Sequence, residues 1–432
     1  MLRGNWGARI KVTKAWVLYD VANSAFILLA TSIIPIYFND LAQADGLTST
    51  QYLAYWSAAA AIVTALMLFI GPVIGSASDR RNWRRPLFIT TVLIGVITCI
   101  ALGFPKWWVA FLIILVICKI AYNASLVVYD SMLNDIVPEE ETDALSSRGY
   151  AMGYIGSIVP FIVCLAFVIL SDLEGLPEAL PKYFTFETAV MISLIITGVW
   201  WFFMSLPLFR TYEQKRFNTV ENRTVSQALK YTWGTIKDIS TNPAMFLFMI
   251  AFFFYIDGVN TIIELSIAYG EALDLGSVGL LGAMLLSQVV AFPSTLIMNK
   301  LAYRFGTHRI IFSSIVGYIC ISIFALFLSY IWQFFILACA VGLFQGTIQA
   351  LSRSYFSRMV PKEKTGEYFG ILDVFGKGAT ILGTFSVALL TTLFDEVRVV
   401  AVVLLVMFSI GLVFFQLSVR NEVYDINETP EE

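Results

Sequence analysis

The chain has 432 residues, of which 58% are hydrophobic and 14% are charged, and its mean hydropathy is +0.77. A water-soluble domain carries about 25% charged residues, so this composition excludes an ordinary soluble enzyme. It predicts an all-α integral membrane protein that crosses the lipid bilayer many times. The formal net charge of −3 gives no reason to expect a nucleic-acid partner.

Apolar segments long enough to span a bilayer as helices recur along the whole chain. We expect twelve of them, at residues 16–38, 52–76, 86–104, 107–130, 148–170, 186–207, 243–268, 277–299, 309–330, 332–352, 367–392 and 397–418. The longest polar stretch divides the chain into two halves. The expected parts are an N-terminal six-helix bundle at 1–208, a cytoplasmic connecting loop at 209–242, a C-terminal six-helix bundle at 243–420, and an acidic cytoplasmic tail at 421–432.

The basic residues between these segments predict the orientation in the membrane. Of the 28 Lys and Arg residues, 23 lie in loops or termini on one side, three lie on the other side, and two lie within spans. Cytoplasmic loops carry an excess of Lys and Arg. We therefore expect both termini to lie in the cytoplasm.

Two basic loops repeat at a constant offset of 224 residues, one at 75–85 and one at 299–309. Arg80 corresponds to Arg304, and Asn82 corresponds to Gly306. Because Asn tolerates a left-handed backbone conformation, a tight turn is expected at Asn82 as well as at the glycine. The repeat supports two related halves.

The first loop places Gly75 four residues before the pair Asp79-Arg80 and ends in a basic cluster, and so resembles the signature loop of the major facilitator superfamily. The resemblance implies a conformational latch between helix ends of the two halves in the outward-open state. Generic positive charge on the cytoplasmic side is the simpler alternative. The second copy has Tyr303 where the acid would stand. The candidate latch residues are Gly75, Asp79, Arg80, Arg84, Arg85, Arg304 and Arg309.

Polar side chains inside the apolar segments are the candidate substrate ligands, because ionisable groups in hydrocarbon are costly and usually face a cavity. These are Asp20, Asn23, Asn123, Asp257, Asn260, Gln345, Gln349 and Lys377. Asp257 and Glu264 lie on one helical stripe and are the candidate proton carriers, with a proton as the candidate coupling ion. Structural alternatives stay open: Asp20 would equally suit a turn in the membrane, and intramembrane amides often only join helices.

Several runs together are similar to the vacuole-effluxer-like family, which includes the fungal autophagy-linked vacuolar amino-acid exporter and many bacterial members. They are residues 19–26, 122–124, 149–156, 257–261, 345–354, 367–370 and 376–377. The resemblance implies a twelve-span transporter with a central cavity and, by analogy with the fungal member, efflux of amino acids. It also implies the bacterial cytoplasmic membrane as the location.

The expected function is secondary active transport of small polar or zwitterionic solutes by alternating access, with amino acids as the expected class. An exporter of amphipathic drugs or lipids is one alternative, and a membrane receptor or scaffold that moves nothing is another. We expect no enzyme and no cofactor, since the sequence has no nucleotide-binding loop and no zinc-protease motif. His308 is the single histidine, so no metal site is expected.

Overall fold

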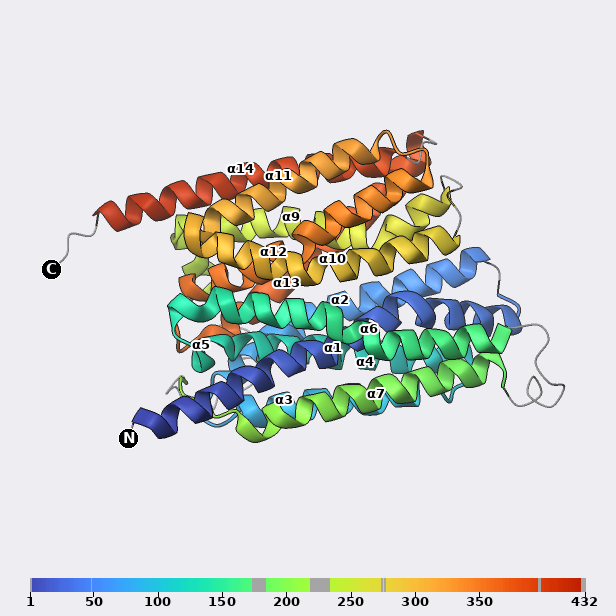
Figure 1. Ribbon diagram of the computed structural model, residues 1–432, viewed down its shortest axis with the longest axis horizontal. Coiled ribbons are helices and arrows are strands. Elements are labelled where there is room, and N and C mark those ends of the chain that lie inside the picture. Colours follow the sequence, from blue (N-terminus) through green and yellow to red (C-terminus); the bar gives the residue numbers. More distant parts are fainter. Residues whose placement is uncertain are drawn as a thin grey trace.

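The computed structural model describes residues 2–47, 49–172, 184–217, 234–272, 275, 277–394 and 398–428, and this part of the chain is almost entirely helical (Figure 1). The helices are α1 (Leu2–Ala44), α2 (Ser49–Ser78), α3 (Arg84–Ala101), α4 (Trp108–Ser131), α5 (Leu133–Ile136), η1 (Glu139–Glu141), α6 (Thr142–Asp172), α7 (Phe186–Thr211), α9 (Pro243–Ala272), α10 (Ser277–Phe305), α11 (Thr307–Ala325), α12 (Ile331–Met359), α13 (Thr365–Phe394) and α14 (Val399–Glu428).

Eleven helices in the described part of the chain are long and apolar enough to cross a membrane. The remaining expected span, 367–392, lies within the 30-residue helix α13. Helices suit this role because all their backbone hydrogen bonds close within the segment, which the absence of water in hydrocarbon demands. The prediction of an all-α membrane protein is confirmed.

The helices form two groups, each around its own apolar core. One core gathers buried side chains from Ala15 to Tyr212, and the other gathers buried side chains from Ile239 to Phe415. Figure 1 shows α1 to α7 (blue to green) lying on one side and α9 to α14 (yellow-green to red) on the other, with α2 and α6 next to the second group. We call these groups the N-half and the C-half.

Both chain ends lie at the same end of the helix bundle (Figure 1). This end, which we call the basic end, also carries the turn between α2 and α3. Asn82 in that turn has φ 64°, and Gly306, at the equivalent place between α10 and α11, has φ 94°. The left-handed turn expected at Asn82 is confirmed, and the two basic loops share this backbone feature.

Near the basic end, α2 of the N-half and α13 of the C-half touch backbone to backbone. A Cβ atom on Gly75 would lie 2.2 Å from the carbonyl oxygen of Gly366, and one on Gly370 would lie 2.7 Å from the carbonyl oxygen of Gly71. Side chains at Gly75 or Gly370 would push the helices apart. These glycines therefore allow the halves to close on each other at this end.

Candidate functional site

A buried arginine of the C-half reaches into the N-half close to the basic end. Arg353 on α12 is 5% exposed. Its Nη1 lies 3.0 Å from Asp130 Oδ1 on α4, and its Nη2 lies 3.4 Å from Asp20 Oδ2 on α1. On α6, Ser146 Oγ accepts a hydrogen bond from Nε at 2.8 Å, and the Ser146 carbonyl accepts one from Nη2 at 3.1 Å. One guanidinium thus joins four helices across both halves.

Aromatic rings of the N-half complete the surroundings of this guanidinium. Its Cζ lies 4.5 Å from the ring centroid of Tyr150, 4.6 Å from that of Trp16 and 5.7 Å from that of Tyr129. Cations are attracted to the faces of such rings, most strongly where water is excluded. We call this group the cation cage, formed by Asp20, Asp130, Trp16, Tyr129 and Tyr150.

Contacts within the N-half fix the shape of the cage. Trp16 and Tyr129 stack with centroids 4.4 Å apart, and the Tyr129 hydroxyl donates a hydrogen bond to the Trp16 carbonyl at 3.0 Å. A Cβ on Gly149 would lie 2.1 Å from Asp20 Oδ2, so α6 comes as close to this carboxylate as a glycine allows. The cage walls therefore belong to the N-half alone, and the cation comes from the C-half.

Because Arg353 and Asp20 are buried, the loss of either charge would leave the other without a partner in a poorly solvated place. Asp20 is 6% exposed, and the Asp130 side chain is 26% exposed. Removing one partner of a buried ion pair typically costs about 3–5 kcal/mol, because the other charge is left uncompensated in a poorly solvated place. Separation of the halves would create the same uncompensated charge unless water or another cation replaced Arg353.

A second contact between the halves joins another carboxylate of the N-half to three groups of the C-half. Asp143, at the start of α6, accepts hydrogen bonds from the hydroxyls of Thr307 and Ser354 and forms a 2.6 Å ion pair with Arg358. Thr307 begins α11, and the other two residues lie on α12. This contact is partly exposed, since the Arg358 and Asp143 side chains are 22% and 18% exposed.

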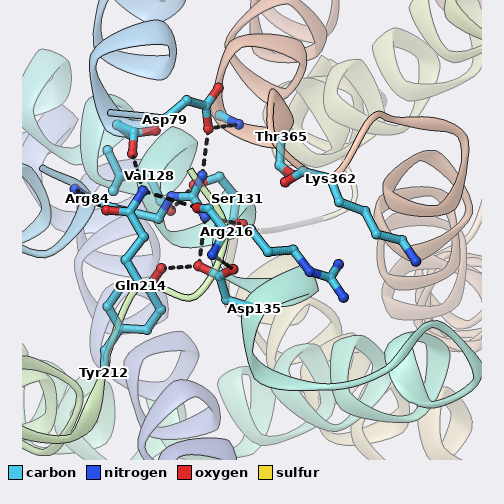
Figure 2. A network of polar contacts seen from close by, with 12 residues as sticks. Asp79, Arg84, Val128, Ser131, Asp135, Tyr212, Gln214, Arg216, Lys362 and Thr365 are labelled. Atoms are coloured by element: carbon cyan, nitrogen blue, oxygen red, sulfur yellow. Dashed lines mark hydrogen bonds and ion pairs between the residues drawn. The ribbon is translucent and has the colours of Figure 1, made fainter. Parts of the chain in front are cut away.

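A third contact between the halves centres on Asp79, which follows α2 (Figure 2). Its carboxylate accepts hydrogen bonds from the backbone N–H groups of Gly366 at 2.8 Å and Glu367 at 2.9 Å, in the first turn of α13. Arg84, which is 1% exposed, pairs with Asp79 at 2.5 Å and with Asp135 at 2.8 Å. A helix N-terminus favours an anion, so this placement suits a carboxylate.

The wider network in Figure 2 binds Asp135 to the segment that follows α7. The Tyr212 hydroxyl donates a hydrogen bond to Asp135 Oδ2 at 2.5 Å, and the Arg216 backbone N–H donates one to Oδ1 at 3.1 Å. Burial raises the pKa of Asp79 to about 6, although Arg84 and the two backbone donors act in the opposite direction. Asp79 can therefore bind a proton in a pH range where an ordinary carboxyl is ionised.

The other arginines predicted as latch residues lie differently. Arg85 donates a hydrogen bond to the Phe209 carbonyl at 2.7 Å within the N-half, and Arg80 lies over the Trp83 ring. Arg304 and Arg309 in the second loop are exposed. Among the described residues, no carboxylate is within ion-pair distance of either of these two.

The structure brings some of the predicted substrate ligands near the cation cage. Asn23 lies on α1 one turn beyond Asp20 and is 4% exposed. Gln349 accepts a hydrogen bond from the hydroxyl of Tyr154 on α6 at 2.9 Å, one turn along α12 from Arg353. Gln345 is 5% exposed on the same helix. Asn123 on α4 is half-buried.

Two of the remaining predicted ligands, Asp257 and Asn260, lie one turn apart on α9 of the C-half. Asp257 on α9 is fully buried, and Thr261 donates a hydrogen bond to its Oδ1 at 3.4 Å. A Cβ on Gly383 of α13 would lie 2.7 Å from both Asp257 carboxylate oxygens. Asn260 is half-buried. Lys377 and Glu264, predicted as a further ligand and a further proton carrier, lie in α13 and α9, and their side chains are not among those that the structure describes.

Sequence reasoning left the central group of this site, Arg353, out of the candidate residues. In the sequence, an arginine near the basic end of a span cannot be distinguished from the many Lys and Arg residues expected on the cytoplasmic side of the membrane. Asp130 and Asp143 were left out as well. The available signal was that Arg353 lies within the run 345–354, one turn beyond Gln349 and on the same helix face.

The sequence is similar to known transport proteins along nearly its whole length. A family model described as vacuole effluxer Atg22 like matches residues 9–422. The MFS-type transporter YxiO of Bacillus subtilis is 34% identical over 421 residues, which cover 97% of this chain and 97% of that protein. Autophagy-related protein 22 of Saccharomyces cerevisiae is 25% identical over 293 residues, which cover 60% of this chain and 53% of that protein.

The fold is similar to solved structures of major facilitator transporters. FucP in the outward conformation superposes with a TM-score of 0.68 at 12% identity, covering 95% of this chain and 98% of FucP. The human organic anion transporter MFSD10 gives a TM-score of 0.68 at 12% identity, covering 95% of this chain and 99% of that protein. At such low identity these similarities show the shared fold alone.

Proposed function

The chain belongs to the Atg22-like vacuole effluxer family of major facilitator membrane transporters, and we propose that it exports or exchanges small zwitterionic solutes, amino acids in particular, by alternating access. Its relatives and structural neighbours are transporters and not enzymes. In our proposal the basic end faces the cytoplasm, and the cation cage, Asp143 and Asp79 hold it closed.

Alternating access requires contacts between the halves that form in one state and break in the other. The insertion of Arg353 into the cation cage is such a contact, because the cage belongs to the N-half and the guanidinium to the C-half. Buried ion pairs of this kind contribute little net stability but strongly disfavour partial separation. We propose that opening the basic end withdraws Arg353 from the cage.

Zwitterionic solutes are the proposed class because the polar groups inside the spans include both charged and amide side chains. In this scheme Asp20 receives the substrate ammonium, and Asn23 and Gln345 fix its orientation. Lys377 would receive the substrate carboxylate. This assignment of roles extends the sequence-based prediction and rests on the buried positions of the first three residues.

We further propose that transport is coupled to protons through Asp257. This carboxyl group is fully buried between α9 and α13, in the half that does not contain the cation cage. A proton carrier must bind and release a proton during the cycle, and ionisable groups inside membrane spans commonly serve in such proton relays. Glu264, one turn beyond Thr261, is the proposed second carrier.

The direct test is counterflow of labelled amino acids in proteoliposomes that contain the purified protein, with and without a proton gradient. We expect saturable exchange, and accumulation that depends on the gradient. Asp257→Asn should abolish the accumulation and leave part of the exchange. Accumulation that is unchanged in Asp257→Asn would refute the proton role, and no exchange for any amino acid with folded protein would refute the substrate class.

A further inference from the structure

The cation cage has the composition of a site for an organic cation, and its present occupant is part of the same chain. Two carboxylates and three aromatic rings surround the Arg353 guanidinium at the distances given above. Aromatic rings combined with acids recognise ammonium and guanidinium groups in many proteins, because the ring faces are electronegative and exclude water. All five cage residues lie on α1, α4 and α6.

Contacts within the N-half hold Trp16, Tyr129 and Asp20 in place without Arg353. The Trp16 Nε1 donates a hydrogen bond to the Tyr129 carbonyl at 3.3 Å, in addition to the hydroxyl contact in the opposite direction. The Tyr19 hydroxyl, next to Asp20 in sequence, is within 2.6 Å of Ser125 Oγ on α4. The packing of α6 against Asp20 through Gly149 holds the third side. The N-half therefore holds three of the five cage residues in place by its own contacts.

Withdrawal of Arg353 would leave the cage with a buried carboxylate, Asp20, and a partly exposed one, Asp130. An uncompensated buried charge is costly, so another cation would be favoured there. We propose that, when the basic end opens, the cationic group of the transported solute enters the cage in place of the Arg353 guanidinium. The solute then bears a primary ammonium or a guanidinium group, and it competes directly with Arg353.

Competition of this kind would link solute binding to the opening of the basic end. A ligand shifts a conformational equilibrium only by its difference in affinity between the two states. The cage can hold Arg353 or the solute cation but not both. A solute bound in the cage therefore disfavours the closed state, in which Arg353 occupies the cage. The solute would have to leave the cage, and move toward Asn23 and the middle of the membrane, before Arg353 returned. This inference rests on the proposed alternating access.

The binding property of the cage can be tested without transport, in the full-length protein. Arg353→Ala removes the occupant, and methylguanidinium chloride is the probe, with methylurea as the neutral control of similar shape. At constant ionic strength we expect methylguanidinium to raise the midpoint of thermal unfolding of Arg353→Ala saturably, by about 1–2 °C at millimolar concentration. The wild type should show a smaller rise, and Arg353→Ala with Asp20→Asn none. Equal effects of the two probes would overturn the inference.

A second measurement uses the wild type, in case Arg353→Ala does not fold. Methylguanidinium should inhibit amino-acid counterflow competitively and methylurea should not. Asp20→Asn should raise the half-inhibitory concentration about tenfold, as expected for the loss of one charged hydrogen bond. Asp45→Asn, which alters an exposed carboxylate outside the cage, should leave it unchanged.

The two measurements separate failure of the inference from failure of the proposed function. Saturable stabilisation of Arg353→Ala by methylguanidinium, without exchange of any amino acid, would retain the cation cage and reject amino acids as substrates. Exchange of amino acids that methylguanidinium and methylurea inhibit equally would retain the transport proposal and reject the cage as the site for the solute cation.

Discussion

The contact between α2 and α13 gives a sharp prediction, because a single methyl group should prevent closure of the basic end. In Gly75→Ala the new Cβ would lie 2.2 Å from the Gly366 carbonyl oxygen, about 1.2 Å short of an ordinary 3.4 Å contact. Separation by that amount would stretch the bonds from Asp79 to the N–H groups of Gly366 and Glu367, now 2.8 and 2.9 Å, beyond hydrogen-bonding distance.

Hydrogen bonds to charged groups contribute about 1.5–3 kcal/mol each, so the loss of two disfavours the closed state by at least about 3 kcal/mol. This corresponds to a decrease of about 150-fold in the ratio of the closed to the open population. Spin labels at the exposed positions Arg81 and Glu363, one in each half, would report the change by distance measurements in nanodiscs. We expect a longer-distance population in Gly75→Ala.

Gly71→Ala is the matched control for this experiment. Gly71 lies one turn earlier on the same helix, and a Cβ there would lie 3.4 Å from the Gly370 carbonyl oxygen, which is an ordinary contact. The control should keep the wild-type distances. Wild-type distances in Gly75→Ala, or equal changes in both variants, would refute this account of the interface.

Two further predictions concern the other contacts between the halves. Burial raises the pKa of Asp79 to about 6, so the closed state binds a proton there more strongly than a state in which the carboxyl group is hydrated and has its ordinary pKa of 3.8. Lowering the pH from 7.5 to 5 should therefore increase the closed population, and the same distance measurement should show no such increase in Asp79→Asn. The groups that face the Asp79 carboxyl are Arg84, Asp135 and the Glu367 backbone. A closed population that decreases on acidification would contradict the predicted direction of the pH effect. For the partly buried Asp143, Asp143→Asn should shift the population toward the open state, whereas Glu139→Gln should have little effect because the Glu139 and Lys362 side chains are each 45% exposed.

The fold could be predicted from the sequence because its determinants are local. Each membrane span is recognised in the sequence as an apolar segment of sufficient length. The turn at Asn82 follows because Asn tolerates a left-handed backbone conformation. The repeat at offset 224 also correctly placed Gly306 at a second turn with positive φ. Such features need no knowledge of which helices lie next to each other.

The candidate site depends on tertiary contacts that no local pattern specifies. Arg353 and Asp20 are 333 residues apart and meet only because α12 packs against α6, which in turn packs against α1. The repeat also placed Arg304 and Arg309 of the second loop among the predicted latch residues. Arg304 is nevertheless exposed, since the second loop has Tyr303, 93% exposed, where the first has the carboxylate that organises its network.

The most direct test of the account is to lock the basic end and measure exchange. Glu139 and Lys362 lie in opposite halves with their charged atoms 3.3 Å apart at the surface. Glu139→Cys with Lys362→Cys, joined by a short cleavable cross-linker in a variant whose native Cys320 and Cys339 are replaced, would hold the two halves together. We expect cross-linking to abolish amino-acid counterflow in proteoliposomes, and reductive cleavage to restore it. Counterflow at the original rate in fully cross-linked protein would contradict alternating access through this end.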